Sequence, residues 1–446
     1  MKSSKTRLVT VAVALAISGL TANVSAQQTC TGPTGESAVN PGDFACGTGA
    51  VASGGLSSAV GNGALASGYA SSATGAHSIA SGTYATATGA YSVASGTYST
   101  ATGVAAYATG FDSTATGVGS NASGTHASAF GFGSRAPGIA STALGALSAA
   151  YGAYSTAVGA ISTAAGAGST ALGALSTANG TYSTAAGLGS FAGGNGSTAL
   201  GAFAATAGTY SSAIGFGSYA AGAGSTALGA RSTAYGANST AVGFDSSASG
   251  SGSTAVGAGA LASGTYSLAS GRNAAATGSN STAVGSNSVA AGPSGTALGE
   301  GANAGAANSV ALGAGSVANR ADTVSVGTSA DPRQITNVAD GTQPGDAVNV
   351  GQFQGLQSQV DDEFSAQDKR ISKIGAMGTA MSSMAMNTAG ADGDNRIAVG
   401  GGFQSGQSAF AVGVQHAFHG THTTVSLSGA FSQGESSVGV GAGMSW

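Results

Sequence analysis

The fold is decided by a repeated stretch such as Ser141-Thr142-Ala143-Leu144-Gly145-Ala146-Leu147-Ser148-Ala149-Ala150-Tyr151-Gly152. A glycine recurs at every seventh residue from Gly47 to Gly299, and an alanine lies two residues before nearly all of them, with Thr206 the exception. From about Leu144 onward, the residue before the glycine alternates between aliphatic and small or polar, so the structural unit is fourteen residues long. Such a fixed period indicates a stacked structure in which each unit contacts mainly its neighbours.

Seven residues is also the period of a coiled coil, but the composition argues against a helix. Each glycine in a helix interior costs roughly 1 kcal/mol relative to alanine, and most other positions hold Ser, Thr or Gly. Thr-Ala-Leu followed by Gly instead predicts a short strand and a turn, with glycine supplying a positive φ. We therefore predict a parallel β-solenoid of about eighteen coils, on the order of 85 Å long. Alanine and one aliphatic side chain per coil should fill its thin interior.

The N-terminus predicts a secretory signal over residues 1–26. Its basic start precedes an apolar run from Leu8 to Leu20 that is too short to span a bilayer, and Val24-Ser25-Ala26 places cleavage between Ala26 and Gln27. Because an exported compartment permits disulfides, we predict that Cys30 and Cys46, the only two cysteines, form a bridge that caps the first coil. Two free thiols are the alternative.

Charge is sparse along the repeats, and this excludes several classes of function. Only five Asp, Glu, Lys or Arg residues lie between Gly47 and Gly299, so the surface fits neither nucleic acid nor a basic membrane patch. The head histidines, His77 and His126, are forty-nine residues apart, and no catalytic constellation is visible. We expect no enzyme activity, no cofactor and no metal. A cluster of His416, His419 and His422 is read as a polar loop in preference to a metal site.

A different segment follows the repeats: Arg333-Gln334-Ile335-Thr336-Asn337-Val338-Ala339-Asp340-Gly341, then Asp346-Ala347-Val348-Asn349-Val350-Gly351-Gln352-Phe353. It resembles the neck of YadA-like trimeric autotransporter adhesins, with Phe353 in place of the usual leucine. The resemblance marks as neck residues Arg333, Gln334, Ile335, Asn337, Val338, Asp346, Ala347, Val348 and Asn349.

The rest of the chain predicts a stalk and a membrane anchor. Apolar residues at heptad spacing, Phe353, Leu356, Val360, Ile374, Met377, Met381 and Met384, fit a coiled-coil seam. Four alternating segments follow from Ile397 to Trp446, typical of outer-membrane barrel strands. Four strands cannot close a barrel, whereas three chains with four strands each close a twelve-stranded one. In the resembling family the anchor also ends in an aromatic residue, here Trp446.

The resemblance implies a domain order: signal peptide 1–26, β-roll head 27–330, neck 331–353, coiled-coil stalk and pore helix 354–390, and membrane anchor 391–446. It implies a homotrimer in the outer membrane, assembled with the barrel-assembly machinery, whose head is exposed on the cell surface. The barrel would anchor and translocate the head. The head would attach to host cells or to matrix proteins of the collagen, fibronectin or laminin class. A self-associating surface protein that drives aggregation or biofilm is the alternative.

Two sets of residues are candidates for ligand contact. The column two residues after each repeat glycine is variable and should face solvent, and it includes Tyr84, Tyr91 and Tyr98. The alternative is that these rings only cover neighbouring coils or subunits. Asn308-Ser309-Val310 begins the best copy of a head repeat linked to collagen binding in some family members. Ser-Thr-Ala ladders also suggest ice binding, a third possibility that the lack of a regular Thr-x-Thr face weakens.

Overall fold

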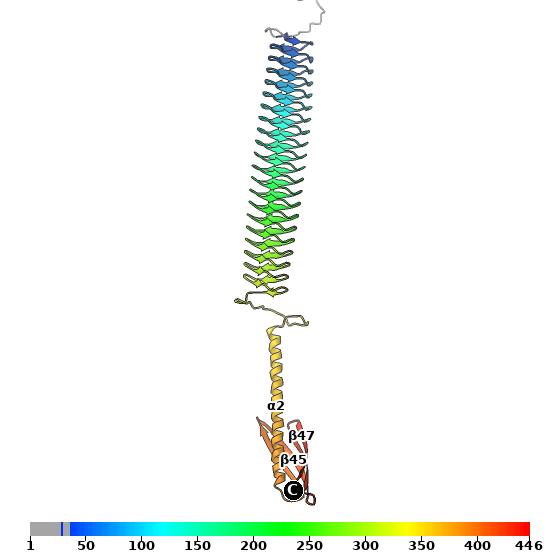
Figure 1. The fold of residues 1–446 in the computed structure, drawn as a ribbon, viewed down its shortest axis with the longest axis vertical. Helices are drawn as coiled ribbons and strands as arrows, with labels where there is room; N and C mark the ends of the chain where they lie inside the picture. The colour runs from blue at the N-terminus through cyan, green and yellow to red at the C-terminus, as the bar shows by residue number, and fades with distance from the viewer. Residues whose placement is uncertain (1–27, 30–35) are drawn as a thin grey trace, which may run out of the picture. The chain divides into compact units, whose positions relative to one another are not determined.

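The computed structural model describes residues 28–29 and 36–446, which divide into one unit up to Arg333 and a second from Gln334 to Trp446. The first unit is a β-solenoid of two parallel sheets (Figure 1). The odd sheet holds the odd-numbered strands from β1 (Gln28–Thr29) to β43 (Val324–Ser325), and the even sheet runs from β2 (Ser37–Ala38) to β42 (Val317–Ala318).

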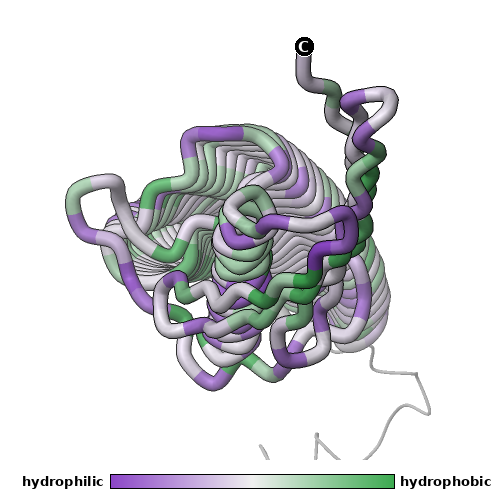
Figure 2. The backbone as a smooth tube through the Cα atoms, turned by 90° about the horizontal axis from the view of Figure 1, so that it is seen from below, coloured by the Kyte–Doolittle hydropathy of each residue, from purple (hydrophilic) through white to green (hydrophobic). Residues whose placement is uncertain are grey.

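The strands follow the fourteen-residue unit without interruption. Odd strands from β3 (Phe44–Cys46) to β41 (Val310–Leu312) cover three residues, and even strands cover two. From β4 (Val51–Ala52) onward, each strand starts fourteen residues after the previous strand of its sheet. Ala143 therefore pairs with Ala157 in the odd sheet and Ala150 with Ala164 in the even sheet. Seen along the solenoid, the coils lie over one another (Figure 2). The described residues contain twenty-one even strands, one per coil, which exceeds the predicted eighteen because the coils continue beyond both ends of the unbroken glycine register.

The interior consists of alanine and serine. Ala143 and Ala150 are fully buried, as are their equivalents in nearly every coil, and buried serines hold the turns. The Ser141 hydroxyl, for example, donates to the carbonyl of Gly138 at 2.7 Å. Thr206, the exception in the alanine column, is fully buried and donates to the Ser197 hydroxyl at 2.8 Å. Many of these buried hydroxyls thus have a partner inside the coil, whereas those of Ser71, Ser99 and Ser169, among others, have none among the described residues.

The predicted place of the aliphatic residue is wrong. Because β17 (Thr142–Leu144) alternates, Ala143 points inward and Leu144 outward, with 48% of Leu144 exposed. Two alanine-lined sheets lie too close together to accept a leucine between them. The aliphatic column therefore forms an outer row on the odd sheet.

The two glycine columns serve different needs. Gly145, after an odd strand, has φ +136°, as predicted, and a Cβ there would lie 2.5 Å from the carbonyl oxygen of Gly159. Gly152, after an even strand, has no positive φ, contrary to the prediction, but a Cβ would overlap the carbonyl oxygen of Gly166. Close approach between coils explains glycine at both columns, whereas backbone conformation explains it only at the first.

The second unit begins with the neck loop and α2 (Val350–Ala389). The Asn349 side chain accepts from the Gln352 backbone N–H at 2.9 Å, and Gln352 reaches back to Asn349, so a capping box starts the helix. No helix within the described ranges combines the length and apolar character needed to cross a bilayer.

The chain ends in an antiparallel meander of β44 (Asn395–Gln404), β45 (Gln407–Phe418), β46 (Thr423–Ser432) and β47 (Glu435–Met444). One face of this sheet, lined by glycine and alanine, packs on the buried face of α2 through Ala376, Met377, Ala380 and Met384. A Cβ on Gly400 or Gly402 would overlap the helix backbone. The opposite face is exposed and apolar, as the alternation predicts, and it includes Ile397, Phe403, Phe410, Val425, Val438 and Val440.

Candidate functional site on the edges of the head

The turns of the solenoid form two edges with different side chains. We call the turns after odd strands the odd edge and those after even strands the even edge. The second residue after each glycine has a positive φ in almost every coil, for example +58° at Leu147 on the odd edge and +59° at Tyr154 on the even edge. Its N–H donates to the preceding coil, at 2.8 Å from Leu147 to the Phe132 carbonyl. This bond fixes the turn, and the side chain points into solvent.

The predicted tyrosine patch lies on both edges. Tyr84 and Tyr98 stack on the even edge, with ring centroids 5.3 Å apart and planes 2° from parallel. Tyr91 lies on the odd edge and stacks on His77 at 5.2 Å. A seven-residue step is half a coil, so it crosses from one edge to the other. All three tyrosines are about half exposed, and their role in ligand contact stays a prediction.

The even edge carries an aromatic ladder, which we define as Tyr69, Tyr84, Tyr98, Phe111 and His126. Successive ring centroids are 5.3–5.8 Å apart. The His126 ring nitrogen lies 3.2 Å from the Asp112 carboxylate, one coil earlier. Because the faces of Tyr84 and Tyr98 cover each other, this pair offers ring edges and hydroxyls to a partner.

The outer rows of the two sheets exchange character within the head. In the N-terminal coils the odd sheet presents Thr74, Thr88, Thr102 and Thr116, while the even sheet presents Leu65, Ile79, Val93 and Tyr107. From Phe130 onward the odd-sheet row is largely aliphatic, and the even-sheet row begins Asn121, Arg135, Ala149, Thr163. The N-terminal odd sheet also contains a Thr-x-Thr array, Thr86/Thr88 to Thr114/Thr116, that sequence reading missed. Reading one column at fourteen-residue steps shows both features.

The other candidate, Asn308-Ser309-Val310, is not presented as a single surface. Ser309 is fully buried, and its hydroxyl donates to the Ala306 carbonyl at 2.7 Å, so its side chain cannot reach a ligand in this fold. Asn308 is exposed on the even edge and donates to Asp322 at 3.0 Å. Val310 is half-buried in β41.

Arg333 of the predicted neck closes the last coil of the solenoid. Its guanidinium donates to the Ser316 hydroxyl at 2.7 Å, to the Val326 carbonyl at 2.9 Å and to the Ala314 carbonyl. No further coil follows, so these groups would otherwise have no partner from the ladder. Arg333 thus replaces the hydrogen bonds that a next coil would supply.

The remaining neck residues form a loop held to the start of α2. Asn349 donates to the Val338 carbonyl at 3.0 Å, and Gln352 bonds both backbone groups of Gly341. Backbone N–H groups of Thr342 and Gln343 donate to Asp346 and lower the pKa of its carboxyl group. Exposed positions in this loop are Gln334, Ile335, Asn337, Ala347 and Val348.

Several predictions concern the ends of the chain. The signal cleavage between Ala26 and Gln27 and the cysteine Cys30 lie outside the described residues, so the cleavage and the Cys30–Cys46 bridge stay predictions. Trp446 is fully exposed at the C-terminus. His419 pairs with Asp394 at 2.7 Å and His416 lies 2.7 Å from Asn395. Among the described residues, no group of three metal-ligating side chains is close enough to hold an ion.

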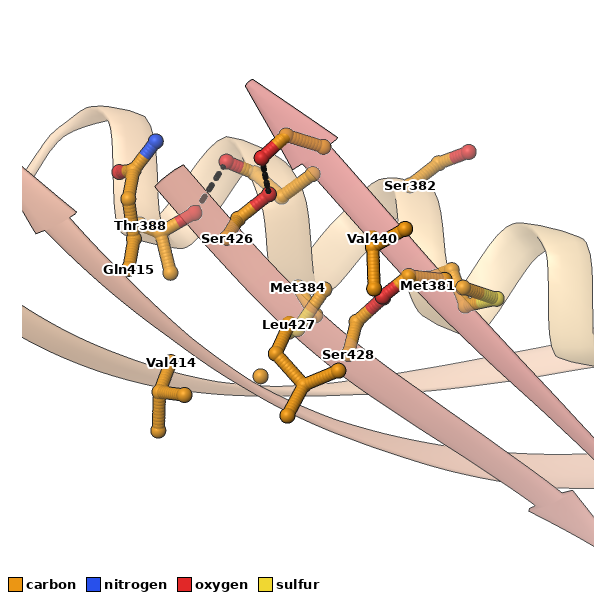
Figure 3. Close-up of a pocket in the computed structure, with 14 residues that line it drawn as sticks. Met381, Ser382, Met384, Thr388, Val414, Gln415, Ser426, Leu427, Ser428 and Val440 are labelled. Carbon is orange, nitrogen blue, oxygen red and sulfur yellow. Dashed lines mark hydrogen bonds between the residues drawn. The ribbon is translucent and has the colours of Figure 1, made fainter. Parts of the chain in front are cut away.

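An open groove of about 390 Å³ runs between α2 and the last strands (Figure 3). Met381 and Ser382 line one side, and Ser426, Ser428 and Val440 line the other. Met377 and Met384 of the predicted seam are buried against the sheet, whereas Phe353, Leu356 and Ile374 are exposed. Part of the seam therefore packs within the chain.

The chain is similar to known proteins along most of its length. A structure of the collagen-binding domain of the Yersinia adhesin YadA matches with 28% identity over 44% of this chain and 84% of that one, at a TM-score of 0.24. No curated protein matches. Family models match in chain order: repeats of the YadA head domain between 59 and 330, the coiled stalk of trimeric autotransporter adhesins over 334–376, and the YadA-like membrane anchor domain over 388–446. Because these matches cover well over half of the residues, the chain belongs to the YadA-like trimeric autotransporter adhesins.

Proposed function

We propose that the protein is a homotrimeric adhesin of the outer membrane, whose head attaches the cell to host cells or matrix proteins. The observation that carries this proposal is the terminal sheet, with one small-residue face on α2 and one exposed apolar face. Neither β44 nor β47 pairs along its outer side within the part of the chain that the structure describes. Unpaired strand edges are not tolerated in lipid. If three copies close a twelve-stranded barrel, β44 of each chain pairs with β47 of the next and no edge stays open.

Three chains also account for the groove beside α2. The half-buried Met381 and the exposed Ser382 and Ala385 line it, and a neighbouring helix in the lumen would cover them. Phe353, Leu356 and Val360 would then meet their counterparts at the start of the stalk. Such a barrel would serve as the anchor and as the route by which the head reaches the surface.

In the head, the aliphatic row of the odd sheet is the surface that would face the threefold axis. It includes Leu144, Leu172, Leu200, Leu228, Leu298 and Leu312, each about 41–48% exposed in the single chain. Long exposed apolar surfaces are rare on monomers and mark association sites. The even sheet, whose outer row is mostly polar or small after Tyr107, would face the medium.

Attachment is proposed to reside in the N-terminal coils, where the aromatic ladder lies beside the apolar row Leu65, Ile79 and Val93. Val93, Ser95 and Tyr98 flank one turn, so the row and the ladder form one surface. Tyrosine is a favoured contact residue at interfaces. Three chains per particle would add weak contacts as avidity, with gains of about 10² to 10⁴.

A display experiment tests this function. Cells carrying the full chain are measured for attachment to collagen, fibronectin, laminin and host-cell monolayers, and for clumping in suspension. Tyr84→Ala with Tyr98→Ala should reduce attachment at least tenfold while heat-resistant trimers remain. Tyr219→Ala with Tyr235→Ala, a pair of contacting rings farther along the even sheet, is the matched control. Equal attachment by both double variants would move the site away from the ladder.

Self-association is the second candidate function. The aromatic ladder of one trimer would contact the aromatic ladder of a trimer on another cell. Ring edges and hydroxyls are self-complementary, so two copies of this surface can bind each other. Clumping that is lost in the ladder variant, without binding to any matrix protein, would favour this function over attachment to a host.

A further inference from the structure

The odd edge carries an unbroken row of apolar side chains through nine coils. We call it the odd-edge row, and its members are Val104, Val118, Phe132, Leu147, Ile161, Leu175, Leu188, Phe203 and Phe216. Each is 47–61% exposed. Together they expose several hundred Å², the same order as the about 800 Å² that one partner contributes to a standard interface. Such a surface on a secreted rod calls for a partner.

The even edge of the same coils carries the most exposed tyrosines of the head. Tyr154, Tyr182 and Tyr210 lie at every second coil and are 72–77% exposed. The Tyr182 ring rests on the turn of the preceding coil, where a Cβ on Gly168 would lie 2.7 Å from its Cδ1. Tyr210 rests on Gly196 in the same way. The edge therefore alternates between a projecting ring and a glycine that leaves room.

Both edges change character after Phe216. The odd edge continues with Arg231, Asp245, Asn273 and Asn287, and Arg231 pairs with Asp245 at 3.5 Å. The even edge continues with Asn238, Asn280 and Asn308. Phe244 and Tyr266 are the large side chains that remain. The odd edge and the even edge therefore become polar at the same position along the solenoid. This is expected if the odd edge of one chain contacts the even edge of a symmetry-related chain.

We propose that, in the homotrimer, the odd-edge row of each chain packs on the tyrosines Tyr154, Tyr182 and Tyr210 of the next chain. This inference rests on the proposed trimer. A threefold ring needs two different surfaces per chain, and each flattened coil has two sheets joined by two edges. With the odd sheet facing the axis, the odd edge of one chain comes beside the even edge of its neighbour.

A second copy of the chain is the partner that fits the spacing. The odd-edge row repeats once per coil, at about 4.8 Å, and a neighbouring solenoid repeats with the same step. The head surface carries few charged side chains, so it does not favour a strongly charged partner. The coils before Val104 offer no such row, because their odd edge holds Asn62, His77 and Tyr91. The rings of Tyr69, Tyr84 and Tyr98, on the even edge of these coils, therefore stay open for a ligand.

Cysteine pairing in the full-length protein tests the contact. Leu175→Cys combined with Tyr182→Cys places thiols on opposite edges of the same chain, where they cannot meet each other. Under mild oxidation of dilute, detergent-extracted trimers, the pair should give covalent dimers and trimers on denaturing gels. Each single variant should stay uncrosslinked, and so should Leu175→Cys with Ala205→Cys, which lies on the outward row of the even sheet.

The outcomes separate the edge contact from the trimer itself. Intact trimers without cross-links, cross-links in the single variants, or cross-links that grow with particle concentration would each overturn the edge-to-edge contact. Loss of trimers in the unaltered chain would instead refute the proposed assembly. As a second measurement, Ile161→Ser, Leu175→Ser and Phe203→Ser together should lower the dissociation temperature of the trimer by about 5 °C or more. Leu261→Ser on the even sheet should leave it unchanged.

Discussion

The N-terminal coils up to Thr116 and the coils from Phe130 onward have the same backbone and interior but different outer surfaces. Both bury alanine and serine, and both stack glycine on glycine. The first stretch presents threonine on the odd sheet and apolar residues on the even sheet, and the second largely reverses this arrangement. The inward columns thus maintain the fold, which leaves the outward columns free to select partners.

Substitutions in the shared glycine column should have the largest effect and should not distinguish the two stretches. Gly82→Ala and Gly152→Ala each force a Cβ into the backbone of the next coil, so each should destabilise the head by about 3 kcal/mol. Thermal unfolding followed by circular dichroism measures this loss. Gly119→Asn is the control, because a Cβ there meets nothing within 4 Å and asparagine accepts a positive φ. Different losses at Gly82 and Gly152 would break the claim of a common interior.

The outer row of the odd sheet should distinguish the two stretches. Leu144→Ser, Leu172→Ser and Leu200→Ser together should weaken the trimer by about 1.5–3 kcal/mol per leucine, if each is buried there. Thr88→Ser, Thr102→Ser and Thr116→Ser remove only methyl groups from the equivalent row. We expect heat-resistant trimers on gels to be lost in the first set and kept in the second. Equal behaviour would show that this row does not face the axis.

The end of the second stretch depends on Arg333. Replacing it with alanine leaves the carbonyls of Ala314 and Val326 without their donor, at a cost of about 1–3 kcal/mol. The last coil should open first, which hydrogen exchange at residues 314–326 detects. Arg333→Lys keeps the charge but lacks the planar guanidinium group with its several donors. It should therefore preserve only part of the protection against hydrogen exchange at residues 314–326. Full protection in the alanine variant would show that the coil needs no cap.

Acid should have the smallest effect, and we expect it to act on the neck loop, which lies beyond both stretches. The pKa of Asp346 is lowered from 3.8 by hydrogen bonds from Thr342 and Gln343. Its contribution to the neck loop is therefore fully present above about pH 4 and is lost as the pH falls through the lowered value. Below that range, residues 341–349 should lose protection against hydrogen exchange. Asp346→Asn should remove the pH dependence, and an unchanged profile would assign the loop to other contacts.

The periodicity predicts the solenoid. Alternation within each short segment indicates a strand with one inward residue, and a glycine at every seventh residue indicates a regularly repeated turn. The prediction of an aliphatic side chain inside each coil is wrong, because Ala143 occupies the inward position and leaves the outer one to Leu144. Tyr84, Tyr91 and Tyr98 are close in sequence, but a step of seven residues crosses to the other edge of the coil, so Tyr91 lies apart from the other two. The exposed face from Ile397 to Trp446 was predicted in full from alternation. The close contact of Gly400 and Gly402 with α2 was not, because it depends on how two elements pack.

The direction of the hydrogen-bond ladder determines how the head responds to force. Bonds such as Thr142 N–H to the Ser155 carbonyl, 2.9 Å, join successive coils and therefore run along the rod. Tension between a bound surface and the cell would peel one coil at a time. Each release converts about 4.8 Å of rod into about 45 Å of extended chain, at up to ~3.3 Å per residue. Under flow, the protein that holds the cell would thus lengthen and dissipate energy before the attachment fails.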